Sequence, residues 1–437
     1  MSFRRVRRGA GSRERCPIVQ LRAVRNSDTT KGSMIEKLNV TGFKSLAAVE
    51  IALGQVNVFI GANGSGKSNL LEAISVIGAA AFGRVDEESL TRRGCRRGIF
   101  YRPMFESPPP AQETTIEAIG TDGSSYLADL AGPDFKVSRQ RGTAWQFKRE
   151  VLNSCKERVV ERPAANGMVS GNPEAGLAAL KRAELESSDP AAELLKQLSD
   201  YNIYAPDTPV LRGLAKEPER NPVGLSGGGL AGALADLYEM DATKQQFISP
   251  DPPELRDELE ELLSSVDWFG GLHAFKSQQM ADGSVRPYFG FEDRFFGAKG
   301  NEGYLLEPIE VNEGMLYLLF VAVLCLHPNS PRFLGLDNAD HGLNPRLVRH
   351  LTEAMCRWIL RSRPSRQILM TTHNPLVLDG LPLQDERVRL FTVARTNLGH
   401  TTIRQVLMTP ELMQQGKKGW TLSRLWVMGH LGGVPNV

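Results

Sequence analysis

The chain has 437 residues, 41% hydrophobic and 23% charged, an ordinary composition for a globular protein with a large core. The net charge of +2 is uneven: residues 1–33 carry net +7 and the rest net −5, which excludes a body with overall affinity for nucleic acid. The longest apolar run, Met315–Leu326, has 12 residues and is too short to cross a membrane. The five cysteines lack CxxC spacing, which indicates free thiols in a reducing cytoplasm.

The N-terminal third begins with residues 1–33, which are basic and lack the apolar stretch of a secretory signal. We expect a disordered tail there, with nucleic-acid binding as the alternative. Met34–Phe43 and Val49–Leu53 alternate apolar and polar residues, which predicts an antiparallel strand pair. Gln55–Gly61 is an apolar strand that runs into a glycine-rich loop, and Ser68–Ala81 has the pattern of a buried helix.

The rest of the chain divides into a mixed middle and a regular last third. Residues 34–150 hold the glycine-rich loop and a β lobe, with short strands at 113–150; 151–270 form a mainly helical insertion, and 271–437 alternate helices and strands. We therefore expect an α/β fold with an antiparallel β lobe and a helical insertion. The elements expected in the last third are a helix at Met315–Leu326, a strand at Arg332–Asp337, a helix at Pro345–Arg361, and strands at Gln367–Thr371 and Arg387–Ala394.

The glycine-rich loop carries the first functional motif. Residues 61–68 (GANGSGKS) fit every fixed position of the P-loop pattern GxxxxGK[ST], with a strand before and a helix after. Glycines let backbone N–H groups turn towards phosphate, Lys67 supplies a positive charge, and Ser68 is a ligand for Mg²⁺. The loop predicts a site for ATP and Mg²⁺. Its residues are Gly61, Asn63, Gly64, Ser65, Gly66, Lys67, Ser68 and Asn69.

A second motif is the apolar strand Arg332–Asp337, which ends in a carboxylate as a Walker B strand does. A strand beside the P-loop strand would bring Asp337, with Ser68, to the Mg²⁺ ion. The alternative is a core strand that ends in an aspartate.

Three segments give the chain a family resemblance: GFKSL at Gly42–Leu46, DNADHGLNP at Asp337–Pro345 and TTHNP at Thr371–Pro375. They resemble the RecF, OLD (overcoming lysogenization defect) and SMC ATPases, whose segments read like DEPExGLHP and THSP. The resemblance implies a P-loop NTPase fold of the ABC-ATPase type and a head-to-tail homodimer with two ATP molecules at its interface. It also implies that His373 senses the γ-phosphate; a structural histidine is the alternative. Lys44 is a weaker candidate for a nucleotide contact.

The resemblance requires a signature motif that contacts the ATP of the second subunit, and two segments compete for it. Leu225–Gly229 (LSGGG) looks like a transporter signature but lies 108 residues before Asp337. Asn312 and Gly314 open a helix, and Gly314 lies only 23 residues before Asp337. A helix N-terminus there would direct N–H groups and a positive dipole end at phosphate. We therefore select Asn312 and Gly314 and expect 225–229 to be a flexible loop.

The chain departs from the family at Asn338, where the usual residue is a glutamate that polarises the attacking water. An amide binds water but does not accept its proton at neutral pH. Asp340 is a carboxylate that could substitute. We expect slow or partner-activated hydrolysis, below about 1 s⁻¹ without a partner. The Q-loop glutamine stays open among Gln112, Gln140 and Gln146.

Two functions fit these residues. The first is a nucleotide switch in antiphage defence that controls a separate effector, because the 64 residues after His373 are too few for the Toprim nuclease of OLD proteins. The second is a RecF-like ATPase in DNA repair or recombination. A transporter subunit is disfavoured by the roughly 240 residues between the P-loop and the signature. The tail Leu422–Val437 either docks a partner or packs on its own core. The basic residues available for DNA are Arg92, Arg93, Arg96, Arg97 and Arg102.

Overall fold

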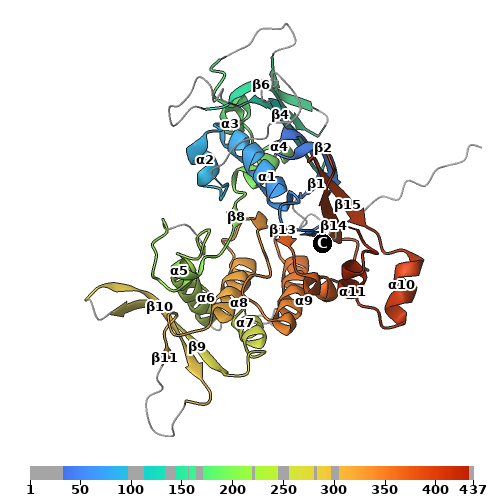
Figure 1. Cartoon of the computed structure of the whole chain (residues 1–437). Helices are drawn as coiled ribbons and strands as arrows, with labels where there is room; N and C mark the ends of the chain where they lie inside the picture. The colour runs from blue at the N-terminus through green and yellow to red at the C-terminus, as the bar shows by residue number, and fades with distance from the viewer. Residues whose placement is uncertain are drawn as a thin grey trace, which may run out of the picture.

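The computed structural model describes residues 33–96, 113–132, 144–155, 157–163, 171–218, 222–244, 255–279, 283–296 and 305–432. Three sheets organise these residues: a six-stranded core sheet, a six-stranded antiparallel sheet and a three-stranded sheet (Figure 1). The predicted tail, apart from Ser33, lies outside the described residues.

The core sheet has the strand order β15-β14-β3-β13-β12-β8. β3 pairs in parallel with β13 and β14, β12 pairs in parallel with β13 and β8, and β15 returns antiparallel to β14. Every residue of β3, β12 and β13 is buried, as expected for parallel strands covered on both faces. The strands are β3 (Val56–Ile60), β8 (Ile203–Tyr204), β12 (Phe333–Leu336), β13 (Gln367–Thr372), β14 (Val388–Arg395) and β15 (Thr401–Val406).

Two hydrophobic cores meet at this sheet. Val56, Val58 and Ile60 of β3 face a cluster that includes helices α8 (Glu313–Leu326) and α9 (Pro345–Arg361). Phe59, on the opposite face of the same strand, joins a cluster that includes α1 (Lys67–Phe82). The alternation places the helix that follows the P-loop on one side of the sheet and the helix that begins at the candidate signature on the other.

The antiparallel sheet is the expected β lobe, with the order β2-β1-β4-β5-β6-β7. Its inner face shares a core with α1. The expected boundary at residue 150 falls inside strand β6, because the β6–β7 hairpin extends this sheet. The elements of the lobe are β1 (Ile35–Phe43), β2 (Leu46–Ala52), α2 (Glu87–Thr91), β4 (Glu113–Gly120), β5 (Ser125–Ala131), β6 (Gln146–Ser154), β7 (Glu157–Arg162), α3 (Leu177–Arg182) and α4 (Pro190–Ser199).

The segment expected as a helical insertion contains both helices and strands. β8 lies inside this segment but pairs with β12 of the core sheet, and β9 crosses the expected boundary at residue 270. Figure 1 shows the β9–β11 sheet projecting at the lower left, beyond α6 and away from the core sheet. The elements are α5 (Thr208–Leu211), α6 (Leu230–Lys244), α7 (Leu255–Leu263), β9 (Phe269–Gln279), β10 (Val285–Asp293) and β11 (Leu305–Leu306).

The C-terminal segment packs on its own core, one of the two alternatives considered for it. The 3₁₀ helix η1 (Pro375–Gly380) contacts α11 (Leu422–Val427), and Leu425 and Trp426 of α11 are buried. Helix α10 (Pro410–Lys417) precedes α11. Within the described ranges, no helix combines the length and the apolar character needed to cross a membrane.

Candidate functional site

The P-loop lies between β3 and α1 and is shaped by close backbone contacts. A Cβ atom on Gly61 would lie 2.1 Å from the carbonyl oxygen of Val393, and one on Gly66 would lie 2.0 Å from Thr401 Oγ1. Gly66 also has φ +105°, a conformation that favours glycine. By contrast, Gly64 has φ +77° with no atom within 4 Å of such a Cβ. The loop is therefore fixed at its two ends and open at its exposed tip, Asn63–Gly64.

Lys67 and Ser65 have the environment that a phosphate site requires. Lys67 is 6% exposed, and its Nζ donates to the carbonyl oxygens of Gly61 and Ala62 at 2.8 and 2.9 Å. Burial lowers the pKa of Lys67, against the opposing charges of Asp337 and Asp340. The buried Ser65 hydroxyl has no partner among the described residues. The ammonium group can exchange loop carbonyls for phosphate oxygens, so these residues fit ATP.

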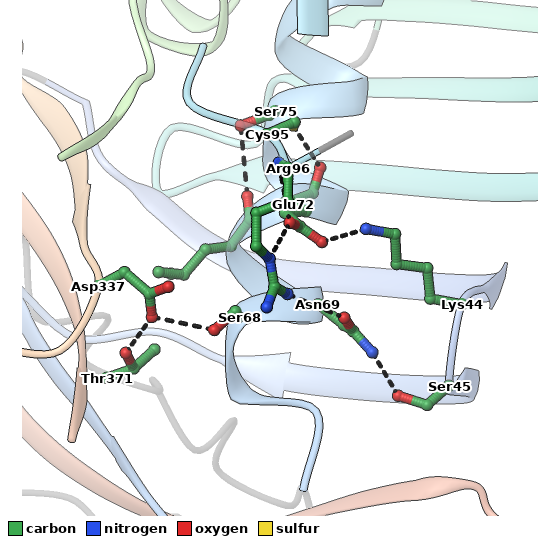
Figure 2. Close-up of polar contacts among 11 residues, drawn as sticks. Lys44, Ser45, Ser68, Asn69, Glu72, Ser75, Cys95, Arg96, Asp337 and Thr371 are labelled. Carbon is green, nitrogen blue, oxygen red and sulfur yellow. Dashed lines mark hydrogen bonds and ion pairs between the residues drawn. The ribbon is translucent and has the colours of Figure 1, made fainter. Parts of the chain in front are cut away.

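The predicted Mg²⁺ ligands lie together, Ser68 in the first turn of α1 and Asp337 directly after β12. The Ser68 hydroxyl donates to Asp337 Oδ1 at 3.1 Å, and the Thr371 hydroxyl donates to the same oxygen (Figure 2). Among the described residues, no group of three or more His, Cys, Asp or Glu side chains gathers into a metal site. One carboxylate and one hydroxyl suit Mg²⁺, which keeps several waters and takes its other ligands from phosphate.

The turn after β12 brings the remaining predicted catalytic residues together. Asn338 is left-handed with φ +55°, and its N–H donates to Thr371 Oγ1 at 3.0 Å. Asp340 is 6% exposed and accepts from Thr372 Oγ1 at 2.7 Å. His373 Nδ1 lies 3.7 Å from Asp340 Oδ2, while half of the histidine side chain stays exposed. The Asp340 carboxylate is thus buried, and the half-exposed His373 lies beside it.

The candidate signature lies at the start of α8, where Asn312 accepts a hydrogen bond from Met315 N at 2.9 Å and so caps the helix. Gly314 closely approaches the turn after β12, because a Cβ on it would lie 3.0 Å from the Gly342 carbonyl oxygen. The competing segment 225–229 precedes α6. The Glu217 carboxylate accepts from three backbone N–H groups there, contacts that the sequence did not predict. Those N–H groups belong to Leu225, Ser226 and Gly228.

Sequence reasoning missed the polar residues of β15 and of the β1–β2 turn that hydrogen-bond to the P-loop and to the start of α1. Thr401, the first residue of β15, donates to the carbonyl oxygen of Ser65 at 2.8 Å and shares a 2.6 Å hydrogen bond with Ser45. Asn69 donates to Ser45 at 2.7 Å. Thr401 lies 336 residues after Ser65, so no local pattern connects them.

Glu72, one turn after Ser68 on α1, is a second missed residue. Its carboxylate is buried and pairs with Lys44, the weaker candidate for a nucleotide contact, and with Arg96 Nε at 2.8 Å (Figure 2). Burial alone would raise the pKa of Glu72, but Arg96 and Lys44 outweigh it and lower the pKa below its ordinary value. The Arg96 guanidinium also lies 3.5 Å from Asn69 Oδ1, and the negative charge of Asp337 helps to raise the pKa of Arg96. Arg96 therefore faces the nucleotide site.

The other members of the arginine cluster are engaged within the chain where the structure describes them. Arg92 pairs with Glu88, and Arg93 is 7% exposed and donates to the carbonyl oxygens of Ser89 and Ser199. Arg97 and Arg102 lie outside the described residues, as do Gln112 and Gln140, whereas Gln146 begins β6.

Family models and relatives match this chain in two stretches. Residues 199–379 match the family described as "AAA domain, putative AbiEii toxin, Type IV TA system", and residues 34–95 match "AAA ATPase domain". Over 141 residues the chain is 36% identical to the DNA replication and repair protein RecF of Paenarthrobacter aurescens (strain TC1). It is 40% identical, also over 141 residues, to RecF of Arthrobacter sp. (strain FB24). Each match spans 32% of this chain and 32% of the relative.

Solved structures with a similar fold cover most of the chain. An SMC head bound to the C-terminal winged-helix domain of ScpA aligns with TM-score 0.52 and 15% identity, over 86% of this chain and 98% of that one. An Smc head with an extended coiled coil, bound to the C-terminal domain of ScpA and derived from Pyrococcus furiosus, aligns with TM-score 0.51 and 12% identity. That alignment covers 89% of this chain and all of the other.

The fold is therefore that of an SMC-head-like P-loop ATPase. The matched ATPase families and the RecF relatives support the resemblance that the motifs predict, to ABC-type ATPases of the RecF/SMC-like group.

Proposed function

We propose that this ATPase is a slowly hydrolysing, dimeric nucleotide switch that controls a separate effector in antiphage defence. The observation that carries the proposal is Asn338, which occupies the position of the water-polarising glutamate beside an otherwise complete Ser68–Asp337–Thr371 arrangement. ATP and Mg²⁺ are held, but the group that would accept the proton of the attacking water is an amide. The ATP-bound state then lasts long enough to be the signal.

Asp340 is the competing base, and its contacts argue against rapid proton transfer. Asp340 is 6% exposed, accepts from Thr372, and lies 3.7 Å from His373. In this proposal His373 senses the γ-phosphate, and Asp340 orients the histidine ring.

The proposed homodimer places the start of α8 from one copy on the ATP of the other. Asn312 caps that helix end through Met315 N, and Gly314 adds no side chain at the start of this helix of 14 residues. The positive end of the helix suits a triphosphate.

The defence role receives support from the family matched over residues 199–379, whose description names a toxin of a type IV toxin–antitoxin system. An effector such as a nuclease would be a partner protein. In cells that carry the chain with its neighbouring genes, we expect Lys67→Ala to abolish protection from phage. Unchanged phage titres for wild type and variant would argue against the defence role.

The direct test of slow hydrolysis is single-turnover ATP hydrolysis by the wild type, Asn338→Asp and Asn338→Ala. Aspartate is the sharper probe, because Asn and Asp tolerate the left-handed backbone, whereas the longer glutamate would add about 1–2 kcal/mol of strain. We expect the wild type below about 1 s⁻¹ and Asn338→Asp at least about tenfold faster. A brisk wild type that Asn338→Asp leaves unchanged would make Asp340 the base.

The second candidate is a RecF-like, DNA-binding ATPase, which the RecF relatives favour. It predicts that duplex DNA stimulates hydrolysis and that DNA affinity falls steeply with salt. Arg96→Gln should lower that salt slope only if this arginine contacts phosphate. Hydrolysis that is indifferent to DNA at low salt would leave the switch as the remaining proposal.

A further inference from the structure

Tyr317 is a buried residue of α8 whose hydroxyl group ends in the turn after β12. Its side chain is 1% exposed, and the hydroxyl donates to the carbonyl oxygen of Asn338 at 2.5 Å. Burial raises the pKa of Tyr317, as do the charges of Asp340 and Asp337, whereas a backbone hydrogen bond from His341 opposes the shift. The hydroxyl therefore binds the first residue of the Asn338–His341 turn, and the turn closes with its own hydrogen bond of 3.1 Å from His341 N to the same Asn338 carbonyl oxygen.

The turn needs such support because Asn338 is left-handed, with φ +55°. The left-handed region costs a non-glycine residue up to about 1–2 kcal/mol, least for asparagine and aspartate, and two contacts hold Asn338 in it. Here Thr371 accepts the Asn338 N–H, and Tyr317 donates to the Asn338 carbonyl. The first contact comes from β13, whose Thr371 also binds Asp337, and the second comes from α8.

The same turn touches the first residues of α8 at two further points. Glu313 Oε1 lies 3.1 Å from His341 Nε2, and the close approach of Gly314 to the Gly342 carbonyl makes the second contact. Thr208 of α5 also donates to Glu313, at 2.5 Å. The helix end proposed to meet the second copy's ATP is thus bound to the loop that follows this chain's own Mg²⁺ ligand.

We infer that Tyr317 is a positioning residue that fixes the Asn338–His341 turn and couples the chain's own ATP site to the start of α8. ATP bound in one site would then fix the position of the start of α8 in the same copy. That helix start is the part proposed to contact the ATP of the second copy. This inference rests on the proposed function as an ATP-dependent dimer and adds the path by which the two sites communicate.

The test is Tyr317→Phe, which removes only the hydroxyl group. Tyr201→Phe is its matched control: Tyr201 is fully buried against Phe333 of β12, and its hydroxyl has no partner among the described residues. Hydrogen exchange of the full chain would be followed at residues 311–320 and 336–346, with and without ATP, at a concentration where the protein is monomeric. ATP affinity would be measured on the same samples, and the single-turnover rate at a concentration where the protein is dimeric.

We expect Tyr317→Phe to speed exchange in 336–346 and to slow hydrolysis by about three- to tenfold each, since one hydrogen bond to the turn is lost. ATP affinity should change less than about twofold, and the ATP-induced change in 311–320 should disappear. Tyr201→Phe should match the wild type.

Two results would overturn the inference: wild-type exchange in Tyr317→Phe, or an equal effect of Tyr201→Phe. The inference would also be overturned if ATP does not change hydrogen exchange in residues 311–320 of the wild type. A wild type that binds ATP and shows the exchange change but does not hydrolyse would refute the ATPase proposal alone.

Discussion

The P-loop and the start of α8 are the two elements proposed to meet ATP, and they are held in different ways. The P-loop is fixed by a backbone carbonyl at Gly61 and by Thr401 at Gly66, with a buried lysine inside. The start of α8 depends on side-chain contacts in which the partners are partly exposed, the His341 side chain by 59% and that of Glu313 by 38%. The P-loop is therefore preformed, whereas the α8 end can follow the turn after β12.

The largest effect is expected from a substitution that disrupts the preformed P-loop. Gly66→Ala puts a methyl group 2.0 Å from Thr401 Oγ1 at φ +105°. We expect a loss of about 2–4 kcal/mol in the free energy of unfolding and an ATP affinity at least about 100-fold weaker. Gly123→Ala is the control, because that glycine has φ +84° and no neighbour within 4 Å, so strain alone should cost about 1 kcal/mol. Denaturation and fluorescent-nucleotide binding measure both; equal losses in the two variants would contradict the role of Thr401.

Glu72→Gln tests whether charge fixes the helix behind the P-loop. We expect a loss of about 1–3 kcal/mol at pH 7, because Lys44 and the partly exposed Arg96 lose a buried carboxylate. The folded-state pKa of Glu72 lies below 4.5, so its stabilising contribution is present above pH 4.5 and is lost as pH falls through the folded value. Wild type and variant should converge in acid. Glu88→Gln, which breaks the exposed pair with Arg92, should change stability by less than about 1 kcal/mol. A stability difference between the wild type and Glu72→Gln that grows as pH falls would contradict a stabilising charge on Glu72.

Thr401→Val sharpens the comparison by removing one hydroxyl group from the P-loop support. The variant leaves the Ser65 carbonyl and the Ser45 hydroxyl without this partner. We expect a loss of about 1–2 kcal/mol and an ATP affinity weaker by a few fold. Thr401→Ser keeps the hydroxyl and should restore both in titration and denaturation; if it behaves like valine, the hydrogen bonds are not the cause.

The smallest effect on stability is expected at α8. Gly314→Ala brings a Cβ to 3.0 Å from the Gly342 carbonyl, a contact that a small shift of the turn relieves, while alanine favours the helix. We expect a change below about 1 kcal/mol and unchanged ATP binding by the monomer, but steady-state hydrolysis at least about fivefold slower because the methyl group covers the helix end. An unchanged hydrolysis rate would contradict the assignment of the signature to Asn312 and Gly314.

Elements with strong local patterns were predicted well. The helix at 345–361 matches α9 in both bounds, and the strand at 367–371 matches β13 to within one residue. The helix expected at 315–326 begins two residues earlier, at Glu313, because Asn312 caps it. The boundaries near 150 and 270 were misplaced, because each falls inside a strand that pairs with the next strand along the chain, β6 with β7 and β9 with β10.

The sequence alone determined the P-loop motif and the order of elements in the last third, and it predicted the roles of Asp337 and Asn338. Each depends on residues within a few positions of one another, where spacing and the strand–loop–helix context are sufficient. Only the tertiary structure decided that Thr401 supports the P-loop, that Glu72 holds Arg96 towards the nucleotide site, and that Tyr317 reaches the turn at Asn338. These contacts join residues from 21 to 336 positions apart, and the packing of α1, α8 and β15 around one sheet brings them together.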